Sequence, residues 1–402
     1  MAKKARRDLT VEEQLARGPM DLPFLMLVVL LTGIGVIMMF SASYASAYYK
    51  LDDPTYYFVK QGLFAVGGIF IMYFTSKISY QRLRWMSVFI LAAAFAFLIL
   101  VKVPGIGVTA KGANRWIRQI GPIPQFQPSE IAKIGIILYF SARLSKRGTE
   151  KKKKYDTRTI KGTFLSLMDR IGLIELLPYM VVLLVTAGLL LLEPHMSATI
   201  LIFAVGASIL FAAGIKLGWF AAGGTFVGAA LVFIITNTDY MQSRIDIWLN
   251  PWSDPQGAGF QAIQSLYAIG SGGLFGLGLG QSRQKFLYLP EPQNDFVFSI
   301  VCEELGYVGA GIILLLFALL ILRGYWLALH ARDRFGALVV VGVTTQLAVQ
   351  VFLNIGVVTN LFPVTGISLP FFSYGGTALL IQLFEMGIIL SVSRQIPAPR
   401  AG

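Results

Sequence analysis

Long apolar blocks are the feature that most restricts how this chain can fold. They run for about 15–28 residues, long enough for a helix rising about 1.5 Å per residue to cross a hydrocarbon core ~30 Å thick. Charged residues make up only 14% of the 402 residues, whereas soluble proteins carry roughly 25%. The pattern predicts an all-α fold, a polytopic helical membrane protein.

About ten membrane helices are expected from these blocks. Their predicted ranges are 22–45, 58–76, 84–101, 128–144, 171–192, 196–214, 217–236, 295–322, 336–358 and 375–393. The first block is too long for a signal-peptide core and lacks a clear small-residue cleavage site, so we expect it to remain a membrane helix. A single membrane domain, 21–394, then lies between two cytoplasmic tails, 1–20 and 395–402. We expect 145–170 to be a basic cytoplasmic loop and 237–294 to be a large extracytoplasmic loop between helices seven and eight.

The positions of the basic residues support this orientation. With both termini inside, 24 of the 34 Lys and Arg residues fall on the cytoplasmic side, nine fall outside and Lys133 lies within a helix. Basic residues prefer the cytoplasmic face, where anionic lipid also attracts them. The net charge of +13 therefore does not indicate nucleic acid. Seven of the nine outer cations lie in 102–127 and 237–294, which suggests an anionic ligand at the outer face.

The first group of candidate residues surrounds the start of the fourth helix. Lys111 and Arg115 precede it, and Pro128 suits its first position. Glu130 and Lys133 are three residues apart and therefore neighbours on one helix face. A lysine one turn inside a membrane helix is costly unless it is paired or faces a cavity. The pair is interpreted as lining an outward-facing cavity, and the alternative is a structural ion pair with Lys133 reaching toward the interface.

The second group lies in the predicted outer loop and leaves two interpretations open. Arg244 is equally compatible with binding phosphate and with pairing to a nearby aspartate such as Asp246.

His195 and His330 are the only histidines and fall on opposite predicted faces, so a two-histidine metal site is not expected. The single cysteine, Cys302, rules out an intrachain disulfide and thiol-based metal motifs.

Asp295 is the strongest catalytic candidate. It follows a glycine-rich run, 270–280, and two cations, Arg283 and Lys285, and it stands at the threshold of a long apolar segment. The glycines allow close backbone approach and positive φ, but they do not match a phosphate-binding fingerprint. We interpret Asp295 as a general base at the outer surface. An N-cap role is the alternative, although it leaves the two preceding cations unexplained.

Three further carboxylates lie inside predicted helices and are candidates for function or for structural pairing. They are Glu303, Glu304 and Glu385. A polar stripe recurs every four residues along the ninth helix and is predicted to form interhelix hydrogen bonds, through Gln346, Gln350 and Asn354. The following segment, 354–380, is apolar but broken by proline and glycine, so we expect a re-entrant or interface-buried outer loop.

Three motifs resemble the SEDS family, which includes FtsW, RodA and SpoVE. They are QPSEIAK at 127–133, YLPEPQNDFVFSIVCEELG at 288–306 and NIGVVTNLFPVTGISLPFFSYGG at 354–376. The PEP sequence before NDF, and SASYASAYY at 41–49, are more similar to the FtsW and SpoVE branch. Two departures are visible. Asn294 stands where the family often has threonine, and EPHMSAT at 193–199 replaces a PDxGT-like segment.

The resemblance implies a peptidoglycan glycosyltransferase of the bacterial cytoplasmic membrane that polymerises lipid II outside that membrane during cell division. Its essential aspartate falls on Asp295, and its Glu/Lys pair falls on Glu130 and Lys133. The reaction is expected to be an inverting transfer, with Lys111, Arg115, Lys133 and Arg244 as candidates for binding the pyrophosphate. The implied partners are lipid II, membrane lipid and a class B penicillin-binding protein. No ligand cluster in the sequence demands a metal ion, although a divalent cation, Mg or Mn, could assist at the pyrophosphate.

Two other classes of function remain open from the sequence. A lipid II flippase would also use ten helices and buried charges, but it should depend on a midplane charged path such as Glu304 and Glu385. A noncatalytic scaffold of a division complex would not need Asp295 at all.

Overall fold

The computed structural model describes residues 18–110, 113–119, 121, 124–147, 159–193, 195–237 and 239–396. Its helices are α2 (Leu22–Leu51), α3 (Tyr56–Lys77), α4 (Gln81–Leu100), α5 (Pro128–Leu144), α6 (Ile160–Ile171), α7 (Leu173–Leu192), α8 (Met196–Ala212), α9 (Leu217–Thr236), α10 (Asp239–Leu249), α11 (Phe260–Ser271), α12 (Val297–Leu329), α13 (Arg334–Val358) and α14 (Gly376–Ser393). A short antiparallel hairpin pairs β1 (Gly107–Ala110) with β2 (Ala113–Ile117). The predicted helical fold is confirmed.

A helix occupies each of the ten predicted ranges, and seven helices of the described part are long and apolar enough to cross a membrane. These seven are α2, α3, α4, α7, α12, α13 and α14. The apolar helices α8 and α9 fall short of that length within the described residues, and α5 has 17 residues with Glu130 and Lys133 near its start. The protein is a multi-pass membrane protein, and ten crossings with both termini inside stay a prediction.

Several segments are more helical than the sequence suggested. The predicted loop 237–294 contains α10, α11 and a 3-10 turn, η1 (Pro251–Ser253). The predicted loop 145–170 contains most of α6, and residues 148–158 lie outside the described part. The eighth predicted helix continues to Leu329 rather than 322, because its apolar run does not end at a helix breaker.

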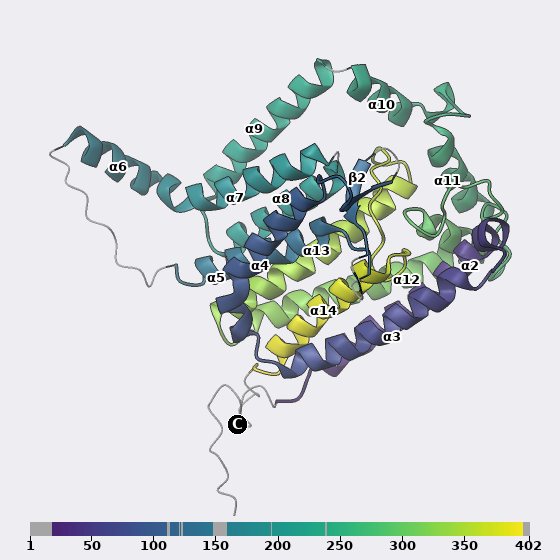
Figure 1. Ribbon diagram of the computed structural model, residues 1–402, viewed down its shortest axis with the longest axis horizontal. Coiled ribbons are helices and arrows are strands. Elements are labelled where there is room, and N and C mark those ends of the chain that lie inside the picture. Colours follow the sequence, from purple (N-terminus) through teal and green to yellow (C-terminus); the bar gives the residue numbers. More distant parts are fainter. Residues whose placement is uncertain are drawn as a thin grey trace, which may run out of the picture.

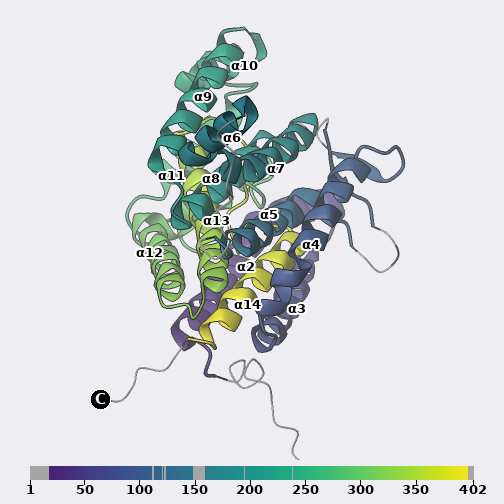
Figure 2. The same cartoon turned by 90° about the vertical axis from the view of Figure 1, so that its left-hand side faces the viewer.

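Figures 1 and 2 show that the start of α2 and the end of α14 lie side by side at one end of the bundle. We call this the basic end and define it by Asp21, Arg147, Arg323 and Arg334, which contact one another's segments. Asp21, which caps α2, accepts a 3.0 Å hydrogen bond from Arg323 of α12. The Asp21 amide donates to Ser393 of α14, and Arg334 of α13 donates to the Arg147 carbonyl after α5. The first turn of α2 therefore lies beside the last turn of α14.

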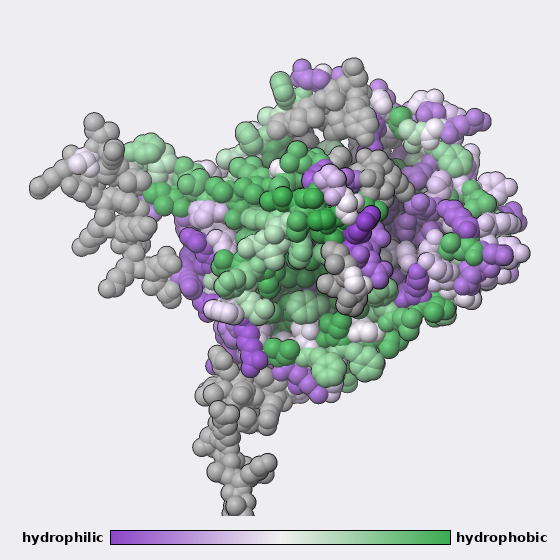
Figure 3. Space-filling view, in the orientation of Figure 1, coloured by the Kyte–Doolittle hydropathy of each residue, from purple (hydrophilic) through white to green (hydrophobic). Residues whose placement is uncertain are grey.

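Apolar side chains cover the outside of the bundle as well as its interior. Leu63, Phe70, Trp85 and Phe89 of α3 and α4 are each at least 60% exposed. Figure 3 shows a broad apolar area over the helical part of the visible face, with hydrophilic residues toward its edges. Lipid tails would cover such a surface, since a soluble monomer rarely exposes so large an apolar area.

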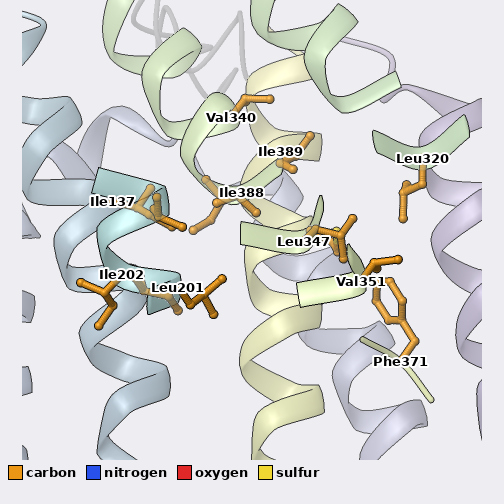
Figure 4. Close-up of a cluster of buried hydrophobic side chains, with 14 of the residues drawn as sticks. Ile137, Leu201, Ile202, Leu320, Val340, Leu347, Val351, Phe371, Ile388 and Ile389 are labelled. Carbon is orange, nitrogen blue, oxygen red and sulfur yellow. The ribbon is translucent and has the colours of Figure 1, made fainter. Parts of the chain in front are cut away.

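The centre of the core lies around α13. Ile137 of α5, Leu201 of α8, Leu347 of α13 and Ile388 of α14 are each at most 3% exposed and approach one another in the bundle interior (Figure 4). Phe371, from the segment between α13 and α14, packs at one end of this cluster. Residues 359–375 contain no helix, and Phe371 and Phe372 in them are buried, which agrees with an interface-buried loop.

The glycine-rich run fills a break in α12. At Gly306 the backbone leaves the helix, with φ 67° and ψ −173°. Four backbone hydrogen bonds of 2.9–3.1 Å join the glycine-rich run to the break. The amides of Leu277 and Gly278 donate to the carbonyls of Glu303 and Glu304, and the amides of Tyr307 and Val308 donate to the carbonyls of Gly273 and Leu274. These bonds pair groups that the interrupted helix cannot satisfy. The predicted close approach and positive φ are confirmed, since Gly276 and Gly278 have φ of 80° and 104°.

Replacing Gly306 by alanine is expected to destabilise the protein by at least about 1–3 kcal/mol, the cost of holding a non-glycine residue in such a conformation. The added methyl group would also lie 2.3 Å from the Gly276 amide nitrogen. Thermal unfolding in detergent measures the effect. Gly311→Ala is the matched control, because nothing lies within 4 Å of a methyl group there. Equal melting temperatures for the two variants would contradict this account of the break.

Candidate active site

Asp295 lies just before α12, and its carboxylate is not the cap of that helix. The N-cap position is Phe296, and the helix has no side-chain cap hydrogen bond. Asp295 is half-buried, and its Oδ2 lies 3.4 Å from the point where a Cβ on Gly366 would stand. Gly366 has φ 72°, in the left-handed region. The carboxylate thus faces a bare stretch of backbone in the 359–375 segment, and the N-cap alternative is not supported.

Asn354 fixes the backbone on both sides of this carboxylate. Its Nδ2 donates to the Asp295 carbonyl at 2.8 Å and to the Ile367 carbonyl at 2.7 Å, and its side chain is fully buried. One amide therefore ties the start of α12 to the 359–375 segment. Of the polar stripe predicted on α13, Gln346 makes the expected interhelix bonds, since it donates to both carboxylate oxygens of Glu385 on α14, at 3.0 and 2.8 Å.

The turn between α7 and α8 reaches the same place. Ser197, at the start of α8, donates to the Thr365 carbonyl, one residue before Gly366. Two residues earlier, the ring nitrogens of His195 lie 3.4 and 3.5 Å from Nε2 of Gln127, the residue that precedes α5. The EPHMSAT segment, whose role the sequence left uncertain, therefore lies between the Asp295 region and the start of α5.

The predicted charge pair is present at the start of α5. Lys133 Nζ lies 2.7 Å from Glu130 Oε2, and the exposed fractions of the two side chains are 2% and 17%. Pro128 occupies the first turn as expected. Lys133 does not reach toward the interface, because its side chain is buried. A buried ammonium beside a partly exposed carboxylate gives this site a fixed, paired charge.

Arg115 and Lys102 both bind the end of α7. Arg115 Nε donates to the Glu193 carbonyl at 3.2 Å, and Lys102 Nζ donates to the Leu192 carbonyl. The last carbonyls of a helix lack intrahelical partners and carry partial negative charge, so cations are favoured there. These contacts place the guanidinium of Arg115 near the His195 turn and hence near Lys133.

Glu193 is a carboxylate that the sequence analysis did not select. Its side chain is fully buried, and neither carboxylate oxygen has a hydrogen-bond partner among the described residues. Burial raises its pKa to about 8, although Lys102 and Arg115 lower it. The only signal in the sequence was a charged residue at the end of an apolar block.

The raised pKa of Glu193 predicts a pH dependence of stability. Between its ordinary pKa of 4.5 and about 8, the folded protein holds a proton that the unfolded chain releases. The contribution of this group to stability is therefore complete below pH 4.5 and falls as the pH rises to about 8. Glu193→Gln should melt higher than wild type at pH 9, by roughly 2–4 °C, and like wild type at pH 4. A difference in melting temperature between Glu193→Gln and wild type that does not change from pH 4 to pH 9 would contradict the assignment. Asp246→Asn, which removes an exposed carboxylate, serves as the control.

The remaining predicted ligands are less closely tied to Asp295. Arg244 is exposed on α10, one turn before Trp248, whose indole donates to the Asn360 carbonyl at 3.1 Å. Asn360 Nδ2 donates back to the Trp248 carbonyl at 3.2 Å, so α10 is attached to the 359–375 segment. Lys111 lies outside the described residues.

The expectation that Lys285 is an outer cation beside Asp295 is wrong. Its Nζ lies 2.9 Å from Glu304 Oε1 and 3.1 Å from Ser41 Oγ, and it donates to the Gly280 carbonyl at 2.6 Å. Its side chain is 3% exposed. The glycine-rich run folds back onto α12, which carries Lys285 inward and away from the surface. No group of three or more His, Cys, Asp or Glu in the described residues could hold a metal ion.

The sequence model of the FtsW, RodA and SpoVE family, described as "Cell cycle protein", matches residues 22–397. Stage V sporulation protein E of Bacillus subtilis is 41% identical over 375 residues, 93% of this chain and 97% of that protein. A probable peptidoglycan glycosyltransferase FtsW of Trichlorobacter lovleyi is 40% identical over 95% of each chain. A chain in a solved peptidoglycan synthase complex has a TM-score of 0.74 and 28% identity, covering 94% of this chain and 98% of that one.

Proposed function

The chain belongs to the FtsW, RodA and SpoVE family of cell cycle proteins and is a peptidoglycan glycosyltransferase, and we propose that it polymerises lipid II at the outer face of the bacterial cytoplasmic membrane. The observation that carries this proposal is that residues 193–197 contact both regions. Arg115 donates to the Glu193 carbonyl, Gln127 before α5 contacts His195, and Ser197 donates to the Thr365 carbonyl beside Gly366. A base and cations for a phosphate leaving group are the two things that this transfer requires.

Asp295 is the proposed general base. The 4-hydroxyl of the GlcNAc of one lipid-linked disaccharide attacks the MurNAc anomeric carbon of another. The hydroxyl proton passes to the Asp295 carboxylate as the new glycosidic bond forms. The anomeric carbon inverts, and its bond to phosphate breaks, so undecaprenyl pyrophosphate leaves with the electron pair. Gly366 has no side chain to stand in front of the carboxylate, whose Oδ2 lies 3.4 Å from where a Cβ there would be.

The cations nearby are proposed to stabilise the leaving pyrophosphate. Arg115 is half-buried and fixed by the Glu193 carbonyl, and Lys133 is fixed by Glu130. Prepositioned cations in a partly buried site stabilise developing negative charge without reorganising. Lys111 and Arg244 are further candidates from the sequence. A divalent cation, if bound with the substrate, would supply further positive charge for the leaving pyrophosphate.

A class B penicillin-binding protein is the proposed partner, crosslinking the strands that this chain makes during division. The similar chain belongs to a synthase complex that coordinates polymerization and crosslinking. The flippase alternative is disfavoured by the buried carboxylates it would use. Glu304 is held by Lys285, and Glu385 is held by Gln346, so both have structural partners.

Polymerisation of purified lipid II in detergent, with and without a class B partner, tests the proposed function. Glycan strands longer than the substrate are expected at least when the partner is present. If neither preparation makes polymer while the protein is folded and binds its partner, the scaffold interpretation gains and the enzymatic one fails.

A further inference from the structure

A small open cavity lies at the end of the bundle opposite the basic end. Arg323, late in α12, contacts Asp21, just before α2, so the end of α2 and the start of α12 lie at that opposite end. The cavity has a volume of about 260 Å³, and its walls are the last two turns of α2 and the segment 285–292. It therefore opens only a few residues before Asp295.

Ser46, in the α2 wall, indicates that this cavity takes a polar ligand. Its side chain is 2% exposed, yet its hydroxyl has no hydrogen-bond partner among the described residues. A hydroxyl on a helix can donate to the carbonyl one turn earlier, as Thr32 of the same helix does to Val28. A buried hydroxyl without a partner is unfavourable, so a polar group that entered the cavity would gain by bonding it.

The α2 wall also carries an available positive charge. Lys50 lies one turn after Ser46 and is exposed, so its ammonium and the hydroxyl can meet the same ligand. Lys285 borders the cavity too, but its ammonium is held by Glu304 and forms no part of the ligand site. An anionic group entering here would therefore bind to Lys50.

The other wall carries a fixed negative charge. Glu291 lies between Pro290 and Pro292 and has φ 48°, which is strained for any residue but glycine. Its Oε2 accepts a 3.0 Å hydrogen bond from Nδ2 of Asn294. The cavity thus contains charges of both signs, with leucine and proline side chains between them.

A substrate held at Asp295 can extend into this cavity. Glu291 and Asp295 are four positions apart, so their Cα atoms are at most about 14 Å from each other. Lipid II carries a short peptide on its disaccharide, and five extended residues span roughly 17 Å. Such a peptide offers a terminal carboxylate and a side-chain amine, whereas a pyrophosphate would be repelled by Glu291 and a lipid tail would desolvate both charges.

We propose that this cavity is the subsite for the peptide of lipid II, an inference that rests on the proposed function. Lys50 and Ser46 bind a carboxylate of the peptide, and Glu291 binds its amine. The leucine and proline side chains of 287–292 contact its apolar parts.

Steady-state polymerisation with two substrates tests this subsite in the full chain, together with a class B partner. One substrate is lipid II with its complete peptide, and the other is the same lipid-linked disaccharide without the peptide. Lys50→Met is compared with wild type. The matched control is Lys60→Met, which removes an exposed lysine of α3 that does not line the cavity.

With the complete peptide, Lys50→Met should raise KM about two- to five-fold and leave kcat unchanged, as expected for the loss of a partly exposed ion pair. With the peptide-free substrate, Lys50→Met and wild type should have the same KM. Lys60→Met should match wild type with both substrates.

Glu291→Gln tests the other wall, because glutamine keeps an acceptor for Asn294 but loses the charge. Acetylating the amine of the peptide should raise the KM of wild type and leave the KM of Glu291→Gln unchanged. A Glu291→Gln protein that still prefers the free amine would remove Glu291 from the subsite.

The failure of this inference is distinguishable from the failure of the proposed function. If Lys50→Met and wild type have the same KM for the complete substrate, the peptide subsite is refuted while the glycosyltransferase stands. If Lys50→Met weakens both substrates equally, the lysine acts on the sugars or the pyrophosphate, and the subsite is again refuted. If wild type makes no polymer from either substrate, the proposed function itself fails and the subsite falls with it.

Discussion

Asp295→Asn is expected to reduce glycan polymerisation by about 100- to 10,000-fold, the range that general base catalysis contributes. Asparagine has nearly the same shape as aspartate and keeps the backbone contact with Asn354, but it cannot accept the hydroxyl proton. The effect should fall on the rate of chain growth rather than on substrate affinity, since the carboxylate acts on the acceptor oxygen in the transition state. Strand length and rate from purified lipid II measure it.

Two controls separate catalysis from folding. Asp246→Asn removes a carboxylate from the exposed face of α10 and should leave the rate near wild type. Asp295→Asn should keep the wild-type melting temperature and lipid II binding, because asparagine has nearly the same shape and keeps the backbone contact with Asn354. A folded Asp295→Asn protein that makes normal strands would remove Asp295 from the mechanism.

Lys285→Met is expected to destabilise the protein by about 3–5 kcal/mol, the cost of leaving one member of a buried ion pair without its partner. Glu304 is 1% exposed and would keep a hydrogen bond from Ser41 at 2.6 Å but lose the ammonium at 2.9 Å. A lower melting temperature in detergent, and less folded protein in membranes, are the expected measurements.

The double variant Lys285→Met with Glu304→Gln supplies the control. Without the carboxylate charge, most of the lost stability should return, because no uncompensated charge stays buried. The double variant should also polymerise lipid II, since the pair lies away from the proposed site. Loss of activity in a stable double variant would instead show that the charges take part in function, as a transport path requires.

The length of the apolar blocks was enough to predict each of the ten helix ranges. The start of α5 at Pro128 was also predictable, because proline favours the first turn and Glu130 suits the helix dipole. The Glu130–Lys133 pair follows from helix geometry alone. The stripe on α13 was predicted as interhelix bonding. Gln346 makes such bonds to α14, whereas Asn354 binds backbone carbonyls just outside the helices.

Long-range backbone pairing was not predictable from local patterns. The insertion of the glycine-rich run into α12 depends on bonds between residues about 30 positions apart, and it carries Lys285 to Glu304. The sequence placed Lys285 near Asp295 only because the two are close in the chain. Glu193 was missed for a related reason, since its burial depends on how the α7–α8 turn packs against β2 and α5.

Proteoliposomes that receive lipid II only in their outer leaflet provide the most direct test of the central claim. The protein is oriented with its extracytoplasmic face outward, and any required class B partner is present. Wild-type protein should then make glycan from this outer pool without moving lipid II across the bilayer. Fluorescent lipid II that crosses the bilayer while no glycan forms would contradict the claim and identify the chain as a transporter.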